Sequence, residues 1–237
     1  MRYRKTICAA VIASLTAVAI VGVFSARAEE TPVHYFECLP RTNGLYNTDS
    51  CLVMGLPQIF ERLGLSSTPA EIKSAGKSEF TIDVTILGVP THIGCTTEAG
   101  VGTASNPEPF KTSSGVGKTK MTFEGCTVSK PSGCALTEKK IVTNELNMAL
   151  EQSKTFGQGV KLSPVSGETF ATLNMGAECP VGSKVVIKGS DFGRGEKEHE
   201  IEFIEASSSL VVNTNKVSLK GTMVQKDKEG NTVLIAP

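Results

Sequence analysis

The sequence predicts an all-β fold: a disulfide-stapled sandwich or barrel-like domain preceded by a short, partly helical N-terminal segment. From Ser78 onward, apolar residues recur at every second position in many short stretches, which is the period of a half-buried strand. Clusters of Gly, Asn, Ser and Pro separate these stretches, as turns do. Many short strands at close spacing are typical of sandwiches and barrels, and an even number of cysteines beyond the N-terminus favours disulfides.

The N-terminus has the order of a signal peptide. A cationic start from Met1 to Lys5 is followed by an uncharged apolar run over residues 7–24 and by small residues at Ala26 and Ala28. This order predicts a signal peptide over residues 1–28, cleavage after Ala28, and a secreted or cell-surface protein. An uncleaved anchor is the alternative, because about 18 apolar residues can just span a bilayer. No later stretch is apolar enough, so we expect no transmembrane segment in the mature chain.

The charge balance excludes a nucleic-acid partner. The chain has 237 residues with 24 basic and 24 acidic side chains, and loss of the predicted signal peptide leaves 20 basic and 24 acidic ones, a net charge of −4. Binding by phosphate neutralisation needs a clear basic excess. With 40% hydrophobic and 20% charged residues, the composition is not that of a disordered chain. The length suffices for the core of one large domain or of two small ones.

Residues 29–76 are the least regular part of the sequence, and we expect a short helix within them. Apolar residues recur there at three- and four-residue steps, which places them on one helical face: Leu52, Leu56, Ile59, Phe60 and Leu63. Pro57 limits this helix to a turn or two, and Thr68-Pro69 ends it. The predicted organisation is an irregular segment over residues 29–76 and a β-rich domain over residues 77–237.

The clearest strand is the alternation of apolar and polar residues between Phe80 and Ile86. Gly88-Val-Pro90 turns the chain, and the apolar series continues at Ile93 and Cys95, so His92 falls on the polar face. Residues 141–152 fit either a strand or a helix, and the neighbouring strands favour a strand. The further strand candidates are residues 101–104, 118–123, 160–162, 169–173, 184–188, 200–204, 210–212, 217–225 and 232–235.

The predicted mature chain keeps six cysteines, which we expect to form disulfides in an oxidising compartment. Short loops close at low entropic cost, so proximity favours Cys38–Cys51 and Cys126–Cys134 and leaves Cys95–Cys179, among many possible pairings. In that pairing the loss of Cys95 costs most, because its bridge closes the longest loop. A metal site is the alternative, but no C-x-x-C motif and no His at ligand spacing from a Cys occurs. We expect no cofactor and no catalytic thiol.

Short motifs rich in Gly and Cys run along most of the predicted mature chain. They are Gly44-Leu-Tyr46 before Cys51, Ile72-Lys-Ser-Ala-Gly76, Cys95 with Gly100-Val-Gly-Thr103, Thr122-Phe-Glu-Gly-Cys-Thr-Val128, Gly133-Cys134, Ile141-Val-Thr143 with Leu146, Leu162-Ser-Pro164 and Cys179. In these motifs the chain resembles a large family of uncharacterised secreted proteins from soil actinobacteria. The resemblance implies export, a β-rich structure and this cysteine pattern, and it carries over no catalytic residue.

Two charged motifs are candidates for an ion-binding or nucleotide-binding site. Gly117-Lys118-Thr119 ends like a phosphate loop, but that motif needs Gly five positions earlier, where this chain has Thr112, so we expect no nucleotide site. Four carboxylates would share one face of a strand and could hold Ca²⁺: those of Glu196, Glu198, Glu200 and Glu202. No Asp/Asn/Gly loop of a calcium-binding type accompanies them, which favours a solvated face that discourages edge-to-edge pairing.

The histidines of the predicted mature chain are His34, His92 and His199. None lies in an H-E-x-x-H arrangement and no Gly-x-Ser-x-Gly occurs, although a distant Ser and Asp could complete a triad in space. We expect most of these histidines to be ordinary surface or loop residues. Phe110 lies in a predicted hairpin tip over residues 105–115, where it either contacts a partner or packs back on its own loop.

These observations favour a non-catalytic binding or cell-envelope surface module, with an envelope component as the partner. The leading alternative is a secreted hydrolase whose triad or carboxylate pair is dispersed in sequence and converges in a cleft. A self-associating structural component of a wall or coat layer is a third possibility. The sequence assigns no catalytic, cofactor-binding or metal-binding residue.

Overall fold

The structure is a computed structural model that describes residues 31–196 and 199–237. The predicted signal peptide, and Cys8 within it, lie outside the described residues. The described chain is all-β, with 18 strands and one short 3₁₀ turn, η1 (Glu205–Ser207). The predicted all-β, barrel-like fold class is therefore confirmed. No helix in the described chain is long and apolar enough to cross a bilayer.

Eight antiparallel strands close into a barrel. Each pairs with the next, and the last pairs with the first, in the order β3 (Ala70–Gly76), β6 (Thr97–Ser105), β7 (Val116–Glu124), β10 (Leu146–Ser153), β11 (Gly157–Pro164), β14 (Asp191–Glu196), β15 (Glu200–Phe203) and β17 (Asn215–Asp227). Closure leaves these strands with no free edge in the ring.

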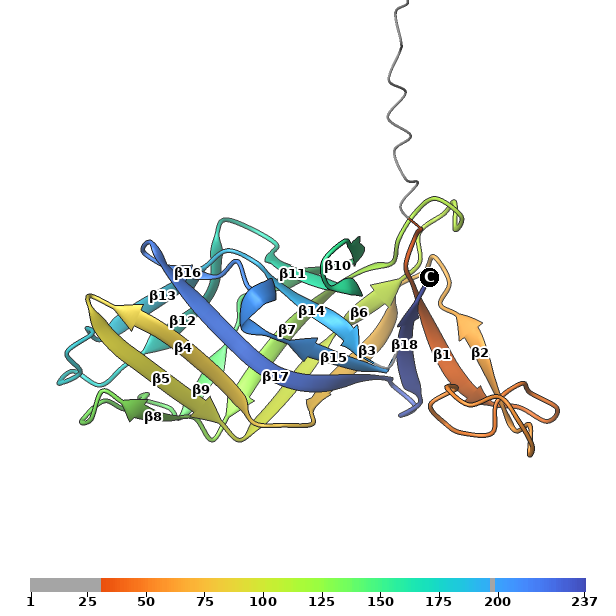
Figure 1. Ribbon diagram of the computed structural model, residues 1–237, viewed down its shortest axis with the longest axis horizontal. Coiled ribbons are helices and arrows are strands. Elements are labelled where there is room, and N and C mark those ends of the chain that lie inside the picture. The colour runs from red at the N-terminus through yellow and green to blue at the C-terminus, as the bar shows by residue number, and fades with distance from the viewer. Residues whose placement is uncertain (1–30, 197–198) are drawn as a thin grey trace, which may run out of the picture.

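Two smaller sheets extend the molecule beyond the barrel (Figure 1). In the first of these sheets, the first half of β17 pairs with β4 (Phe80–Ile86). β4 pairs with β5 (Val89–Cys95), and β5 pairs with β8 (Thr127–Lys130). The second sheet contains β12 (Thr169–Asn174), β13 (Lys184–Lys188) and β16 (Val211–Val212), and β9 (Lys140–Val142) pairs with β7. Apolar side chains from both sheets meet in one layer: Ile82, Phe123, Ile141, Phe170, Ala171, Ile187, Leu210, Val217 and Leu219.

The other end of the molecule is formed by β1 (His34–Pro40), β2 (Phe60–Gly64) and β18 (Thr232–Ala236). β1 lies between β18 and β2, and β18 also pairs with the end of β17. Figure 1 shows these strands at the right-hand end, opposite the outer sheets. A small separate core forms there around Cys38, Tyr46, Cys51 and Leu234.

The predicted helix over residues 52–63 is wrong. The chain is irregular from residue 41 to residue 59, and Phe60 then begins β2, where it pairs with Pro40. Pro57 interrupts the helical hydrogen-bond series, and the Cys38–Cys51 disulfide ties the segment to β1. β3, which the sequence places in the irregular segment, is a barrel strand between β6 and β17.

Three disulfides join the six cysteines, and one of the three proximity-based pairings is correct. Cys38–Cys51 is confirmed, whereas the other bonds are Cys95–Cys126 and Cys134–Cys179. Strand register explains both corrections, because the chain that follows Cys95 pairs with the chain that precedes Cys126. In the same way, an isolated bridge between Leu136 and Met175 brings Cys134 and Cys179 together.

The alternation that predicted the strands is also the alternation of burial. Phe80, Ile82, Val84 and Ile86 on β4 are all buried. The ambiguous residues 141–152 are strand, split into the end of β9 and most of β10 by a short irregular stretch. The rings of Phe80 and Phe123 lie 5.2 Å apart, and Phe203 lies 6.2 Å from Phe80, so aromatic packing joins the barrel to the outer sheets.

Candidate functional site

The candidate site lies on the solvent face of the outer sheet formed by β17, β4, β5 and β8. Alternation on β17 buries Val217 and Leu219 in the core and places Lys216, Ser218 and Lys220 on the opposite face. The polar residues of β4 and β5 face the same way, because the register between these strands is continuous. We call the depression on this face the polar hollow; its lining includes Asp83, Thr85, His92, Lys130, Glu205, Lys216 and Ser218.

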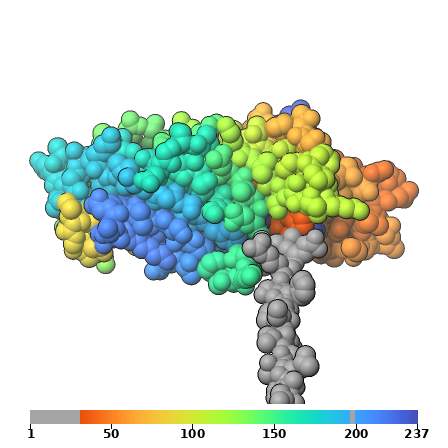
Figure 2. All heavy atoms as spheres, turned by 90° about the horizontal axis from the view of Figure 1, so that it is seen from above, coloured from red at the N-terminus to blue at the C-terminus, as the bar shows by residue number. Residues whose placement is uncertain are grey.

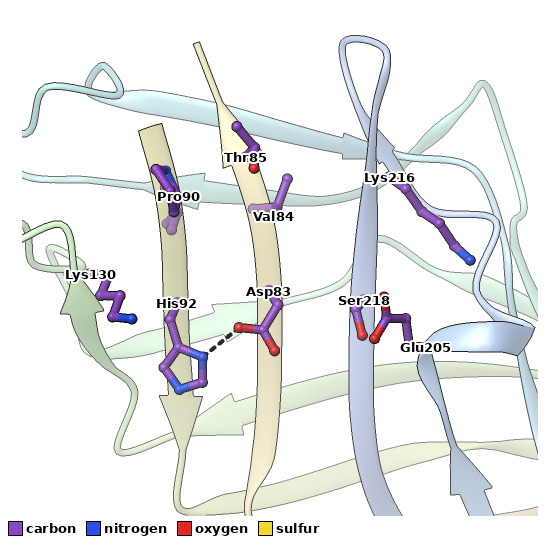
Figure 3. Close-up of a pocket in the computed structure, with 10 residues that line it drawn as sticks. Asp83, Val84, Thr85, Pro90, His92, Lys130, Glu205, Lys216 and Ser218 are labelled. Carbon is purple, nitrogen blue, oxygen red and sulfur yellow. Dashed lines mark hydrogen bonds and ion pairs between the residues drawn. The ribbon is translucent and has the colours of Figure 1, made fainter. Parts of the chain in front are cut away.

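One row of side chains crosses the four strands of the polar hollow. Ser218 lies opposite Asp83, Asp83 opposite His92, and His92 opposite Lys130. Figure 3 shows this row, with Glu205 from η1 beside Ser218. The hollow has a volume of about 340 Å³ and is open to solvent. The β4–β5 hairpin, β8, η1 and β17 thus contribute polar groups to one depression.

The two carboxylates of the polar hollow are both paired. Asp83 Oδ1 lies 2.6 Å from His92 Nδ1, and Lys220 Nζ lies 4.0 Å from Asp83 Oδ2. The same Lys220 ammonium lies 3.3 Å from Glu205 Oε2. Asp83 therefore orients the imidazole, and Lys220 offsets the negative charge of both acids.

Other polar groups of the hollow have no partner within the described chain. The Ser218 side chain is 5% exposed, and its Oγ makes no hydrogen bond. Lys130 and Lys216 make no ion pair within residues 31–196 and 199–237, although the Lys216 ammonium acts electrostatically on buried Asp191. A buried hydroxyl that makes no hydrogen bond is costly, and a bound ligand would supply the missing partner.

The polar hollow carries both signs of charge. Lys130 and Lys216 line it together with Asp83 and Glu205, and Lys220 lies beside both acids. The predicted mature chain has a net charge of −4. Lys130 and Lys216, which make no ion pair in the described chain, can attract an anionic group, while the hydroxyl, imidazole and carboxylate groups of the hollow exchange hydrogen bonds with a ligand.

A disulfide holds the strands that carry His92 and Lys130. Cys95 is the last residue of β5, and its partner Cys126 directly precedes β8. β4 and β5 form a tight hairpin in which Ile86 pairs with Val89. These constraints fix the spacing of the polar groups before any ligand arrives, which reduces the entropic cost of binding.

The three histidines have different surroundings. His34, expected at the surface, is buried; its ring stacks on Phe110 at 3.8 Å, and its Nε2 lies 2.7 Å from the Phe110 carbonyl oxygen. Phe110 therefore packs on β1 and not on its own loop, which neither of its two expected placements describes. His199 Nε2 lies 3.7 Å from Glu200 Oε1. His92 alone of the three lines the polar hollow.

The two charged motifs lie outside the polar hollow. Gly117-Lys118-Thr119 is part of β7 and forms strand, not a phosphate loop. Of the glutamate row, Glu202 is paired with Arg194, while Glu198 and the side chain of Glu196 lie outside the described residues. Within the described chain, no three His, Cys, Asp or Glu side chains form a group that could hold a metal ion.

A second surface feature is apolar. Residues 41–59, which we call the apolar loop, expose an unusual number of large aliphatic side chains: Leu45, Val53, Met54, Leu56 and Ile59. Figure 2 shows this part of the chain, in orange, at one end of the molecule. The two ends of this loop, together with Pro40, line an open depression of about 560 Å³.

No protein-family model matches the chain, no curated protein is similar to it, and no solved structure matches its fold. The polar hollow is therefore interpreted from its own geometry.

Proposed function

We propose that the protein is an exported, non-catalytic binding module that holds a polar component of the cell envelope in the polar hollow. The observation that carries this proposal is Ser218, which lines an open depression and whose hydroxyl oxygen is covered by neighbouring protein atoms without making a hydrogen bond. Rotation about the Cα–Cβ bond would turn this hydroxyl toward a ligand hydroxyl or oxyanion, which would supply the partner that the protein does not. The same ligand would contact the row of side chains that crosses the adjacent strands: Ser218, Asp83, His92 and Lys130.

The proposed location rests on two observations. The three disulfides fit an extracellular, oxidising compartment, because such bonds are rare where thiols are kept reduced. The charged, apolar and small-residue order of residues 1–28 supports removal of that segment at export. The rigid, cross-linked sheet supports binding by a preformed surface.

The test is co-sedimentation of the exported, oxidised protein with isolated cell envelope from the organism that makes it. We expect saturable pelleting that soluble envelope polysaccharide competes away. Ser218→Ala should weaken pelleting about fivefold, the effect of about one lost hydrogen bond. Ser166→Ala is the matched control, because Ser166 is an exposed turn residue far from the hollow in sequence. Protein that stays in the supernatant, or equal affinity for both variants, would contradict the proposal.

Hydrolysis is a second candidate function, and one specific observation favours it. The Asp83–His92 pair places a carboxylate on Nδ1 and leaves Nε2 in an open depression, an arrangement that general bases use. Its order differs from that of a Ser-His-Asp triad, because Asp83, not the imidazole, lies opposite Ser218.

Turnover assays separate the two candidates. If the protein is a hydrolase, envelope fragments are cleaved, and His92→Ala abolishes cleavage while Lys111→Ala, which changes an exposed loop residue, does not. If it is a binding module, the fragments are retained intact by the unmodified protein.

A further inference from the structure

We propose that the ligand of the polar hollow is a linear polyanion: a polymer of sugar or polyol units that carries phosphate or carboxylate groups and lies across the strands from Lys216 to Lys130. This inference rests on the proposed binding function and names its ligand class. It is carried by the positions of the two lysines that lack ion pairs and by the hydrogen-bonding groups between them.

The two lysines lie on opposite sides of the hollow. Lys216 is on β17 and Lys130 is on β8, with β4 and β5 between them, as Figure 3 shows. Three strand spacings of about 4.8 Å separate these strands by roughly 14 Å. In Figure 3 the Lys216 side chain points away from Lys130, so in this arrangement the two ammonium groups do not converge on one phosphate or carboxylate. A chain with anionic groups at intervals along its length can contact both.

The middle of the hollow suits hydroxyl groups. Asp83 and Glu205 can accept hydrogen bonds; Asp83 is in contact with the His92 imidazole, and Lys220 lies between the two acids. Ser218 Oγ can donate or accept a hydrogen bond and has no partner in the described chain. Sugar and polyol hydroxyls both donate and accept, so the uncharged part of a repeat would lie here while its charged groups reach the two lysines.

The cations are lysines, and this fits either oxyanion. An ammonium acts as a compact point charge and does not select the planar geometry of a carboxylate, as an arginine fork does. The openness of the hollow leaves space for the polymer to continue at either side. Whether the anionic groups of the polymer are phosphates or carboxylates is therefore a question for experiment.

The test measures mobility of the exported, oxidised protein in native gels that contain one dissolved polymer. The probes are poly(glycerol phosphate), polygalacturonate and neutral dextran. We expect one or both anionic polymers to retard the protein, more strongly at low salt, and dextran to have no effect. Glycerol phosphate and galacturonate monomers should bind at least tenfold more weakly per unit, because a polymer engages both lysines at once.

Two double variants each remove two positive charges, one variant inside the polar hollow and the other outside it. Lys130→Ala with Lys216→Ala should weaken retardation about tenfold, a loss of about 0.7 kcal/mol at each of two screened charge contacts. Lys111→Ala with Lys120→Ala is the control, because both residues are exposed and lie on other segments. Equal losses from the two double variants would overturn the polyanion site, because they would reflect net charge alone.

The outcomes also separate this inference from the proposed function. If envelope pelleting depends on Ser218 but dextran retards the protein as well as the anionic polymers do, the polyanion inference fails and the binding function stands. If neither the envelope nor any polymer is bound, both fail. Retardation by poly(glycerol phosphate) alone or by polygalacturonate alone identifies the charged group.

Discussion

Glu98 is a carboxylic acid enclosed in the barrel. Its side chain is 4% exposed, Oε1 accepts a hydrogen bond of 2.8 Å from Ser74, and Oε2 has no partner among the described residues. Gly100, on the strand next to Ser74, leaves room for this pair, because a Cβ there would clash with the Ser74 hydroxyl. Burial raises the pKa of Glu98 to about 7, and the Ser74 hydrogen bond offsets only part of that rise. Burial also raises the pKa of Asp191 to about 7.

These two acids predict how stability depends on pH. Each has a higher pKa in the folded chain than in the unfolded chain, so between those values the folded state binds more protons. The stability that protonation contributes is complete below the unfolded pKa and is lost as the pH rises through about 7. The protein should therefore be more stable at pH 5 than at pH 8.

Replacement of Glu98 by Gln tests this account. The amide keeps an acceptor for Ser74 and cannot ionise, so Glu98→Gln should raise the free energy of unfolding at pH 8 by about 2 kcal/mol. At pH 5 the change should be much smaller, and part of the pH dependence should remain because Asp191 is intact. Urea unfolding at the two pH values measures both. Glu124→Gln, at an exposed position, is the control, and equal pH dependence in the two variants would contradict the account.

The polar hollow was partly predictable at this scale. Alternation on Phe80–Ile86 and a turn at Gly88 place Asp83 and His92 on the polar faces of adjoining strands, and a tight hairpin then makes them neighbours. The alternation along the chain predicts His92 on the polar face but does not predict its pairing with Asp83. Ser218 gave no local signal, because its importance depends on β17 lying beside β4.

At the scale of elements, the disulfides show what short-range reasoning can and cannot predict. Cys38 and Cys51 lie 13 residues apart, and proximity predicted their bond correctly. Cys95–Cys126 and Cys134–Cys179 follow strand register instead, with separations of 31 and 45 residues. The helix predicted over residues 52–63 failed for a related reason, because a helical period carries no information about the disulfide and the pairing with β1.

The observed connectivity predicts which bond contributes most to stability. Cys134–Cys179 closes the longest loop, so Cys134→Ser with Cys179→Ser should lower the free energy of unfolding by about 4 kcal/mol in the chain-entropy model. Cys38→Ser with Cys51→Ser should cost about 3 kcal/mol. Urea unfolding compares the two double variants.

Peptide mapping without reductant provides the control, since it should recover peptides linked through Cys95–Cys126 and Cys134–Cys179. A larger loss from the Cys38 and Cys51 variant would contradict the ranking.

At the scale of the whole molecule, β17 joins the parts. Its first half pairs with β4 and β16 in the outer sheets, and its second half pairs with β3 and β15 in the barrel. One apolar cluster continues through both regions, from Ile82 and Val217 to Met223 and Ile201. The barrel and the outer sheets therefore share both a strand and a core.

This continuity predicts a single unfolding transition. Loss of β17 from either region would expose the shared core, so the two regions should unfold together. Calorimetry should give equal calorimetric and van't Hoff enthalpies, and circular dichroism in the far and near ultraviolet should report one midpoint. Two separate midpoints would show that the outer sheets are an independent domain.

The sequence by itself determined the all-β class, the strands with strict alternation, the participation of all six cysteines of residues 31–237 in disulfides, and the polar placement of His92. These properties are local: a period of two and an even cysteine count can be read along the chain. Only the tertiary structure decided the closure of the barrel, two of the three disulfides, the burial of His34, and the meeting of Ser218, Asp83, His92 and Lys130. Those properties depend on which strand lies beside which, and strand register joins residues more than a hundred positions apart, such as Ser218 and Asp83.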